Sequence, residues 1–217
     1  MRQKKQVSEA EEGCCEPKKN AATRIFETAQ QLFYQRGIRA VGVDEIVCTA
    51  GVTKPSLYRS FASKDDLVAA CLESYAEEGK DALMVRIARA GGQPLDELRA
   101  IIGHYADEMS EPGFRGCPMS NTAVEFPEED NPGRAIAESC KAELRELIVG
   151  ITRRLDIDDP EGLGDGLLLL IEGAYSAHQI FGSQGPSHTF IKSAERLIGA
   201  YVGQGARPAD LARQKTG

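Results

Sequence analysis

The chain has 217 residues, of which 41% are hydrophobic and 27% are charged, and its formal net charge is −7. This composition is typical of a globular protein and excludes a fibrous repeat or wholesale disorder. The start of the chain has no apolar stretch that resembles a signal peptide. The longest apolar run, Leu167 to Ile171, is far shorter than the roughly 20 residues that a membrane helix needs. We therefore expect a cytoplasmic protein.

The charge is divided unevenly along the chain. Residues 1–62 hold ten Lys or Arg against seven acids, whereas residues 63–217 hold 16 against 26, so the local balances are +3 and −10. A mildly basic head on an acidic body is compatible with a head that contacts DNA, because the phosphates repel the body.

The first part of the chain predicts a disordered arm and four helices. Residues 1–19 lack hydrophobic periodicity and are rich in Lys, Glu and Gln, a composition typical of disorder. Beyond them, caps and glycines mark helix ends. We expect a first helix at 20–36, with Asn20 as its cap and Gly37 as its stop, and a second at 43–50. A third, short helix is capped by Thr53. A fourth runs from a cap at Ser63 to about Arg89.

Helical spacing continues through the rest of the chain. The stretch from Ser110 to Gly133 contains four prolines and three glycines, so it holds at most one short helix. No segment alternates at period two, and we therefore expect an all-α fold of about nine helices. The remaining helices are predicted at 95–109, around 120–125, and at 133–155, 163–181 and 187–202, followed by a flexible tail at 204–217.

Three short helices near the start, the last two joined at Gly51, predict a helix-turn-helix. Such a unit presents the N-terminal part of its second helix to the major groove of DNA. Its exposed side chains are donors of the kind that bind phosphates and base edges. The candidate DNA-binding residues are Thr53, Lys54, Ser56, Tyr58 and Arg59, with Lys64 as a further phosphate contact.

Three runs in this region resemble the DNA-binding head of the TetR family of transcriptional regulators in order, spacing and residue type. They are GIRAVGVDEI at 37–46, AGVTKPSLY at 50–58 and FASKDDL at 61–67. The later stretch RGCPMSN at 115–121, continuing to Pro127, resembles a subgroup of that family. The resemblance implies a homodimer that binds near-palindromic double-stranded DNA and represses a promoter until a small molecule binds.

Carried onto this chain, the resemblance assigns base reading to Thr53, Lys54 and Ser56, and phosphate contacts to Tyr58 and Lys64. Two positions depart from the family pattern. Gly42 stands where Ser or Thr often opens the second helix, and Val47 stands where a small Ala is common. The implied domains are a DNA-binding domain at 20–66 and a helical ligand-binding and dimerisation domain at 67–203.

The body is expected to hold both a dimer interface and a ligand pocket. Gly173, Ala174, Ser176 and Ala177 are small, so a second copy of the last two long helices could approach them closely. The pocket residues form an apolar set with a few polar groups, which suits a small hydrophobic or aromatic compound, although core packing is the alternative for each. These candidates are His104, Tyr105, Phe114, Cys117, Met119, Phe126 and Tyr175.

The six cysteines, at positions 14, 15, 48, 71, 117 and 140, lack the spacing of a zinc site. We expect no metal and no cofactor. Cys117 lies in the least regular part of the body, where a thiol could meet oxidants or electrophiles, so a thiol-based sensor that acts through Cys117 is the alternative function.

Two other classes of protein compete with a ligand-responsive regulator. A cysteine-dependent enzyme could use Cys117, His104 and Glu125 as nucleophile, base and orienter. The sequence contains no nucleophile elbow, phosphate-binding glycine loop or metal-binding spacing, so we expect no enzyme. An architectural DNA binder without a ligand would not need a body of this size that adds no basic surface.

Overall fold

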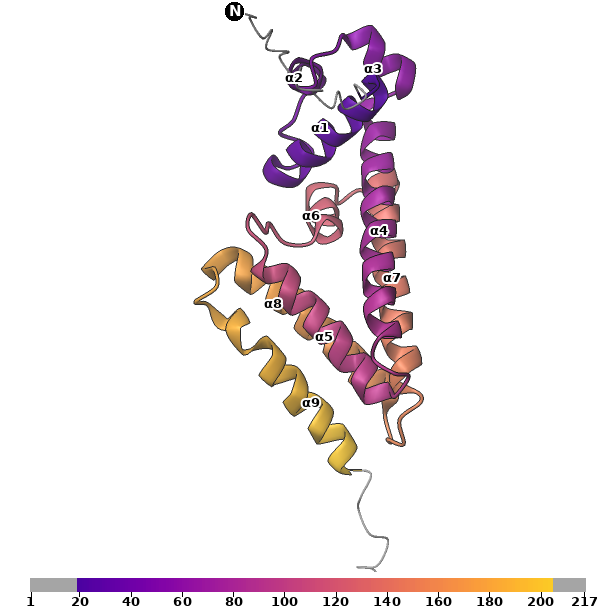
Figure 1. Ribbon diagram of the computed structural model, residues 1–217, viewed down its shortest axis with the longest axis vertical. Coiled ribbons are helices and arrows are strands. Elements are labelled where there is room, and N and C mark those ends of the chain that lie inside the picture. The colour runs from indigo at the N-terminus through magenta and orange to yellow at the C-terminus, as the bar shows by residue number, and fades with distance from the viewer. Residues whose placement is uncertain (1–18, 205–217) are drawn as a thin grey trace, which may run out of the picture.

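The computed structural model describes residues 19–204, and within that range it is all-α (Figure 1). The predicted fold class is confirmed. The arm predicted at 1–19 and the tail at 204–217 lie outside the described residues apart from Lys19 and Gln204. The helices are α1 (Ala21–Arg36), α2 (Val43–Thr49), α3 (Lys54–Ser60), α4 (Lys64–Ala88), α5 (Pro94–Ser110), α6 (Pro118–Glu125), α7 (Pro132–Thr152), α8 (Pro160–Phe181) and α9 (Phe190–Gln204), with a 3₁₀ helix at Pro186–Thr189.

The molecule is elongated, with α1, α2 and α3 at one end (Figure 1). The long helices α4 and α7 run together along its length, and α5, α8 and α9 form the other end. The short helix α6 lies between these two ends. None of the helices within residues 19–204 is both long and apolar enough to cross a lipid bilayer.

Most of the predicted helix ends in the head follow from local hydrogen bonds. The side chain of Asn20 accepts from the Thr23 amide at 2.8 Å, and Ser63 accepts from the Asp66 amide at 3.0 Å. Thr53 occupies the cap position of α3, but its hydroxyl lies 3.0 Å from that of Ser56 and caps no backbone N–H. Thr53 is thus the N-cap residue, as predicted, but its side chain makes no capping hydrogen bond. Gly42, which has no side chain, also leaves α2 without a side-chain cap.

The predicted ends of the later helices differ by a few residues. Helix α8 begins at Pro160 instead of 163, because Asp159 accepts from the Gly162 amide at 2.9 Å and proline suits the first turn. Helix α7 ends at Thr152 instead of 155. The Thr152 hydroxyl donates to the Pro160 carbonyl at 2.7 Å, which fixes the sharp connection between α7 and α8.

The helix-turn-helix is built on a small apolar core. Gly51 takes a φ of +63° in the turn between α2 and α3, a conformation that favours glycine. Leu57 is fully buried and anchors α3. The core, called the head cluster here, extends beyond α1–α3 into the start of α4 and reaches α6 and α7. Its buried members are Ile25, Ala29, Phe33, Ile38, Val41, Ile46, Val47, Ala50, Leu57, Leu67, Val68, Cys71, Leu72, Met119 and Ala137.

A second apolar core, called the body cluster here, fills the space among α4, α5, α7, α8 and α9. It includes Leu83 and Ile87 from the far end of α4, so this helix contributes to both cores. Cys117, which caps α6, packs against both cores as well. The two ends of the molecule are therefore joined by α4 and by the α6 segment.

The contact between α7 and α8 requires a glycine at position 164. A Cβ added there would lie 2.7 Å from Val149 Cγ2 and 3.2 Å from the Val149 Cα. We predict that Gly164→Ala lowers the free energy of unfolding by about 1–3 kcal/mol through overpacking. Gly150→Ala is the matched control, because its Cβ meets nothing within 4 Å and should raise stability by about 1 kcal/mol. Urea denaturation of both variants checks this; equal effects would contradict the packing account.

Candidate nucleic-acid interface and effector cavity

The exposed face of α3 presents the residues that the sequence singled out. Thr53, Lys54, Tyr58 and Arg59 are exposed, and Ser56 is half-buried. The Tyr58 side chain is 51% exposed although it follows the fully buried Leu57. The helix is thus held by one apolar anchor, while its polar side chains face outward.

Two short-range contacts order these side chains. The Arg59 guanidinium donates to the Ser56 hydroxyl at 3.2 Å, and this hydroxyl also lies beside that of Thr53. The Lys54 ammonium lies 2.7 Å from the Asp44 carboxylate in the first turn of α2. This hydrogen bond raises the pKa of Lys54. The Asp44–Lys54 pair was not predicted, because the ten-residue separation indicates a contact only once the turn at Gly51 is formed.

Lys64 is engaged inside the chain. Its ammonium donates to the Ile38 carbonyl at 2.6 Å and lies 5.8 Å from the centre of the Phe33 ring. Burial lowers its pKa from the ordinary value. Lys64 therefore braces the loop between α1 and α2, a position that the sequence did not predict.

The body contains a cavity of about 1290 Å³ between α4, α5, α6, α7 and α8. Aromatic rings form one wall: the Tyr175 ring lies 5.6 Å from that of Tyr105 and 4.8 Å from that of Phe114, both edge-on. The apolar side chains of Leu83, Leu144 and other residues complete the lining. Six of the seven predicted pocket residues line this cavity: His104, Tyr105, Phe114, Cys117, Met119 and Tyr175.

Phe126 does not line the cavity. It follows the end of α6 and packs against the head cluster, and the Arg39 guanidinium lies 5.0 Å from the centre of its ring. Cys117, at the other end of α6, also packs against the head cluster, but it lines the cavity as well.

Charged and polar groups in and beside the cavity form two clusters. Glu108 accepts a hydrogen bond from the Tyr175 hydroxyl and lies 3.4 Å from His104 Nε2. Lys141 pairs with Glu172, which also accepts from the Ser120 hydroxyl at 2.7 Å. The sequence missed Glu108, Lys141 and Glu172. Tyr175 lies 67 residues from Glu108, and Lys141 and Glu172 are 31 residues apart, so neither contact has a local signal. Among residues 19–204, no group of three His, Cys, Asp or Glu side chains is placed to hold a metal ion.

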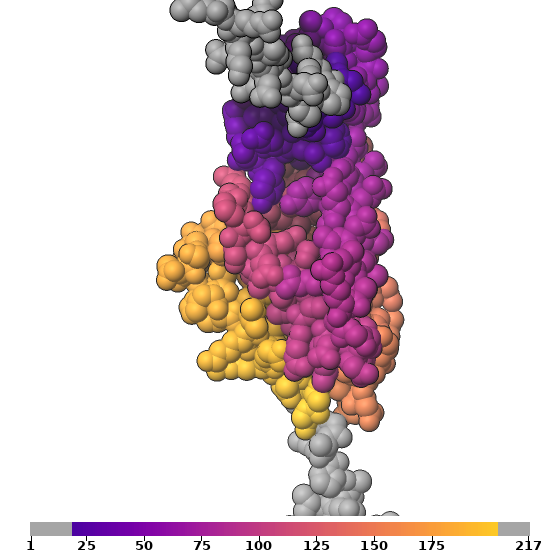
Figure 2. Space-filling view, in the orientation of Figure 1, coloured from indigo at the N-terminus to yellow at the C-terminus, as the bar shows by residue number. Residues whose placement is uncertain are grey.

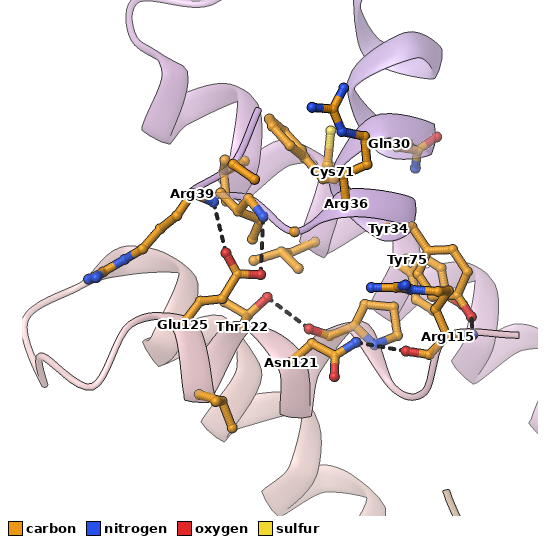
Figure 3. Close-up of a pocket in the computed structure, with 18 of the residues that line it drawn as sticks. Gln30, Tyr34, Arg36, Arg39, Cys71, Tyr75, Arg115, Asn121, Thr122 and Glu125 are labelled. Atoms are coloured by element: carbon orange, nitrogen blue, oxygen red, sulfur yellow. Dashed lines mark hydrogen bonds between the residues drawn. The ribbon is translucent and has the colours of Figure 1, made fainter. Parts of the chain in front are cut away.

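A second cavity, a cleft of about 530 Å³, lies where the head meets the body (Figure 3). Tyr34 and Tyr75 line both cavities, and their rings are stacked with centres 6.1 Å apart. On the body side, the Arg115 amide donates to the Tyr34 hydroxyl at 2.8 Å. Glu125 points toward the loop of the head that contains Arg39, and its carboxylate accepts a hydrogen bond from the Arg39 amide (Figure 3).

Comparisons with known proteins agree on the class of protein. The family described as bacterial regulatory proteins, tetR family, matches residues 25–71. A solved TetR-family transcriptional regulator from Streptomyces coelicolor superposes with a TM-score of 0.80 at 28% identity, covering 84% of this chain and 96% of that chain.

Two curated relatives carry functional names. The transcriptional activator FasR of Mycolicibacterium smegmatis is 30% identical over 137 residues, which cover 61% of this chain and 60% of the relative. The transcriptional repressor BdcR of Escherichia coli is 31% identical over 102 residues, which cover 46% of this chain and 50% of the relative.

A helix-turn-helix head with outward-facing donors, joined to a helical body, defines a DNA-binding transcriptional regulator. Together with these likenesses, it shows that residues 25–71 carry a TetR-family DNA-binding domain and that the chain has the fold of a TetR-family regulator. Regulators of this family bind DNA and act as dimers. The chain is accordingly a regulator and not an enzyme.

Glu108, with its partners His104 and Tyr175, makes a pH-dependent contribution to the stability of the fold. Burial alone would raise the pKa of Glu108, but hydrogen bonds from His104 and Tyr175 outweigh it and lower the pKa below 4.5. A carboxyl with a lowered folded-state pKa stabilises the fold above its unfolded pKa, and this stability is lost as the pH falls through the folded pKa. We predict that Glu108→Gln is less stable than the parent at pH 7 and that the difference shrinks below about pH 4.5. Urea unfolding across pH 3–7 checks this; a constant difference would contradict it.

Proposed function

We propose that this chain is a ligand-responsive repressor that binds a near-palindromic operator as a homodimer and releases it when a small molecule enters the body. The observation that carries the proposal is the combination of an outward-facing set of donors on α3 with a large cavity in the same short chain. We assign DNA binding to residues 20–66, and ligand binding and dimerisation to residues 67–203. Such a regulator would act in the cytoplasm, where a bacterial genome lies.

On the head, we assign base reading to Thr53, Lys54 and Ser56, at the N-terminal end of α3, which a helix-turn-helix inserts into the major groove. Phosphate contacts are assigned to Tyr58 and Arg59, which are exposed beside them. Lys64 stays in this set, because its ammonium has three donors and the bond to Ile38 uses one of them.

The effector proposed for the cavity is a small hydrophobic or aromatic molecule. Its binding site would consist of the aromatic wall and the sulfur-bearing residues at the start of α6, with Glu108 and Lys141 as polar groups that orient it. Entry of the effector shifts the population toward a head spacing that no longer fits DNA. A coupling of about 1–3 kcal/mol corresponds to roughly a 5- to 150-fold change in affinity.

The proposed dimer interface is the outer face of α8 and α9. Helix α9 lies on the flank of the molecule away from α4 (Figure 2). Leu169, Gly173, Ser176 and Ile180 recur at spacings of four, three and four along α8, so they share one face. Leu169 is 73% exposed and Ile180 is 70% exposed. A Cβ at Gly173 would meet nothing within 4 Å, which leaves room for a partner helix. Of the predicted small residues, Ala174 is buried within the chain instead.

The docking assignment is tested at Tyr58. We predict that Tyr58→Ala weakens binding to specific and random duplexes alike, because a phosphate contact carries no base information. Tyr58→Phe, which loses only the hydroxyl, is the matched comparison and should retain part of the affinity. Gel-shift titrations with a fragment from the region upstream of its own gene measure both. Parent-like binding by Tyr58→Ala would contradict the assignment.

The interface is tested by placing charge on it. Leu169→Asp combined with Ile180→Asp should give a monomer in analytical ultracentrifugation and weaken operator binding at least tenfold, because one head alone makes few contacts. Val85→Asp is the control, since Val85 is also 51% exposed but lies on α4. A double variant that remains dimeric would exclude this face.

A thiol-based sensor that acts through Cys117 is the second candidate, and one observation favours it. Cys117 and Lys141 both line the cavity. Burial alone lowers the pKa of Lys141, but Cys117 and Glu172 raise it on balance. A lasting positive charge beside a thiol favours its reaction with electrophiles.

This second candidate predicts that peroxide or a quinone releases DNA from the parent and not from Cys117→Ser. The conservative change removes the sulfur but keeps the size and a polar group, so effector binding in the cavity should survive. Fluorescence anisotropy of a labelled duplex measures the release of DNA from each protein. Identical release from parent and variant would end the thiol hypothesis and leave the effector hypothesis standing.

A further inference from the structure

The loop between α1 and α2 is held by a carboxylate from the body. One oxygen of Glu125, the last residue of α6, accepts from the Ile38 amide at 3.1 Å, and the other accepts from the Arg39 amide at 2.8 Å (Figure 3). The same carboxylate lies so close to Gly37 that an added Cβ would be 2.9 Å from its Oε1. Both acceptor oxygens of Glu125 are thus committed to the head backbone.

The loop is braced from its other side by Lys64, whose ammonium donates to the Ile38 carbonyl at 2.6 Å. The Ile38 side chain itself is only 5% exposed and belongs to the head cluster. Opposite charges from α4 and α6 therefore hold the N–H and the C=O of the same residue, which fixes the path of the chain into α2.

The segment that follows Glu125 adds two contacts to the same loop. The Phe126 ring lies under the Arg39 guanidinium, and Glu128 lies 3.4 Å from the same guanidinium. These two contacts engage an exposed side chain, whereas Glu125 engages the backbone. Glu125 is therefore the member of this group whose displacement must move the loop itself.

The opposite end of α6 belongs to the effector cavity. Cys117 and Met119 line that cavity, and Ser120 donates to Glu172, which pairs with Lys141 in the cavity wall. Helix α6 has eight residues, so about 12 Å of helix separates the cavity from the head loop. A rigid segment of this length transfers a shift at one end to the other.

We propose that Glu125 is a positioning residue for DNA binding and carries the state of the cavity to the head. The hydrogen bonds that Glu125 accepts depend steeply on distance and angle, so a shift of α6 by an occupant of the cavity breaks them. The loop at 37–40 is then free to move, and α2 and α3 change position relative to the body. This inference rests on the proposed function and specifies the route by which the cavity controls the head.

The test places a covalent adduct in the cavity, so the natural effector need not be known. Cys14, Cys15, Cys48 and Cys140 are replaced by Ser, and Cys117 is then alkylated with N-ethylmaleimide, with mass spectrometry to confirm one adduct. Two properties are measured before and after alkylation. One is the affinity for a duplex that the parent selects from a random pool, and the other is hydrogen exchange at the Ile38 and Arg39 amides.

In this background the adduct should change DNA affinity roughly 5- to 150-fold and speed exchange at both amides. With Glu125→Ala added, these amides should exchange fast from the start, and the adduct should change affinity less than twofold. Glu125→Gln, which keeps one acceptor oxygen, should fall between the two and replaces Glu125→Ala if that variant fails to fold. Glu128→Ala removes the same charge beside Arg39 and should behave as the parent.

The outcomes separate this inference from the function on which it rests. If Glu125→Ala shows the same adduct-induced change in affinity as the parent, or if the adduct leaves exchange at both amides unchanged, the role of Glu125 is overturned. If exchange rises while DNA affinity stays constant, the connection through Glu125 stands and control of DNA binding by the cavity is overturned.

Discussion

The packing of α4 into two apolar cores constrains the whole molecule. Its first turns contribute Leu67 and Cys71 to the head cluster, and its last turns contribute Leu83 and Ile87 to the body cluster. A 25-residue helix spans about 37 Å at 1.5 Å per residue. The head can therefore change its orientation only if α4 tilts or if the apolar contacts at one of its ends rearrange. Between these two ends, α4 presents Tyr75 and Gly79 to the cavity, so the helix that fixes the head also forms a wall of that cavity.

Helix α6 supplies a second connection of a different physical kind. The core contacts of α4 are apolar and tolerate small sliding movements, whereas Glu125 meets the head through two hydrogen bonds that depend steeply on geometry. The two connections thus have different effects. Helix α4 keeps head and body together over a range of relative orientations, and α6 favours one of those orientations. This arrangement suits a switch between two orientations of the head, because one connection permits the movement and the other can break.

The sequence predicted the fold well because its signals are local. Asn20, Gly37, Gly51 and Ser63 mark helix ends through contacts within a few residues, and the structure places them at those ends. The start of α8 was missed although Asp159 followed by Pro160 is also a local signal. Buried positions such as Leu57 followed from helical spacing and from the turn at Gly51.

The sites were less predictable because they depend on contacts between distant residues. Donors on α3 were found, since exposure and residue type suffice for them, but the partners Asp44 of Lys54 and Ile38 of Lys64 appear only in the folded chain. In the cavity, aromatic and sulfur-bearing residues could be proposed from their apolar character. Lys141 and Glu172 could not, because a charged residue on a helix is usually solvated and their pairing across 31 residues has no local signal.

Helix α3 is proposed to enter the major groove of DNA in each half of a dimer, and proximity cleavage can detect it there. Ser56 is replaced by Cys in a chain whose other cysteines are Ser, and an iron chelate that cuts nearby DNA is attached there. We expect two clusters of cuts centred about 34–36 Å apart, or a multiple of that distance, along the duplex. The same chelate attached at position 196 of α9 should give none. Absence of cuts from position 56 while the protein remains bound to the DNA would contradict the claim.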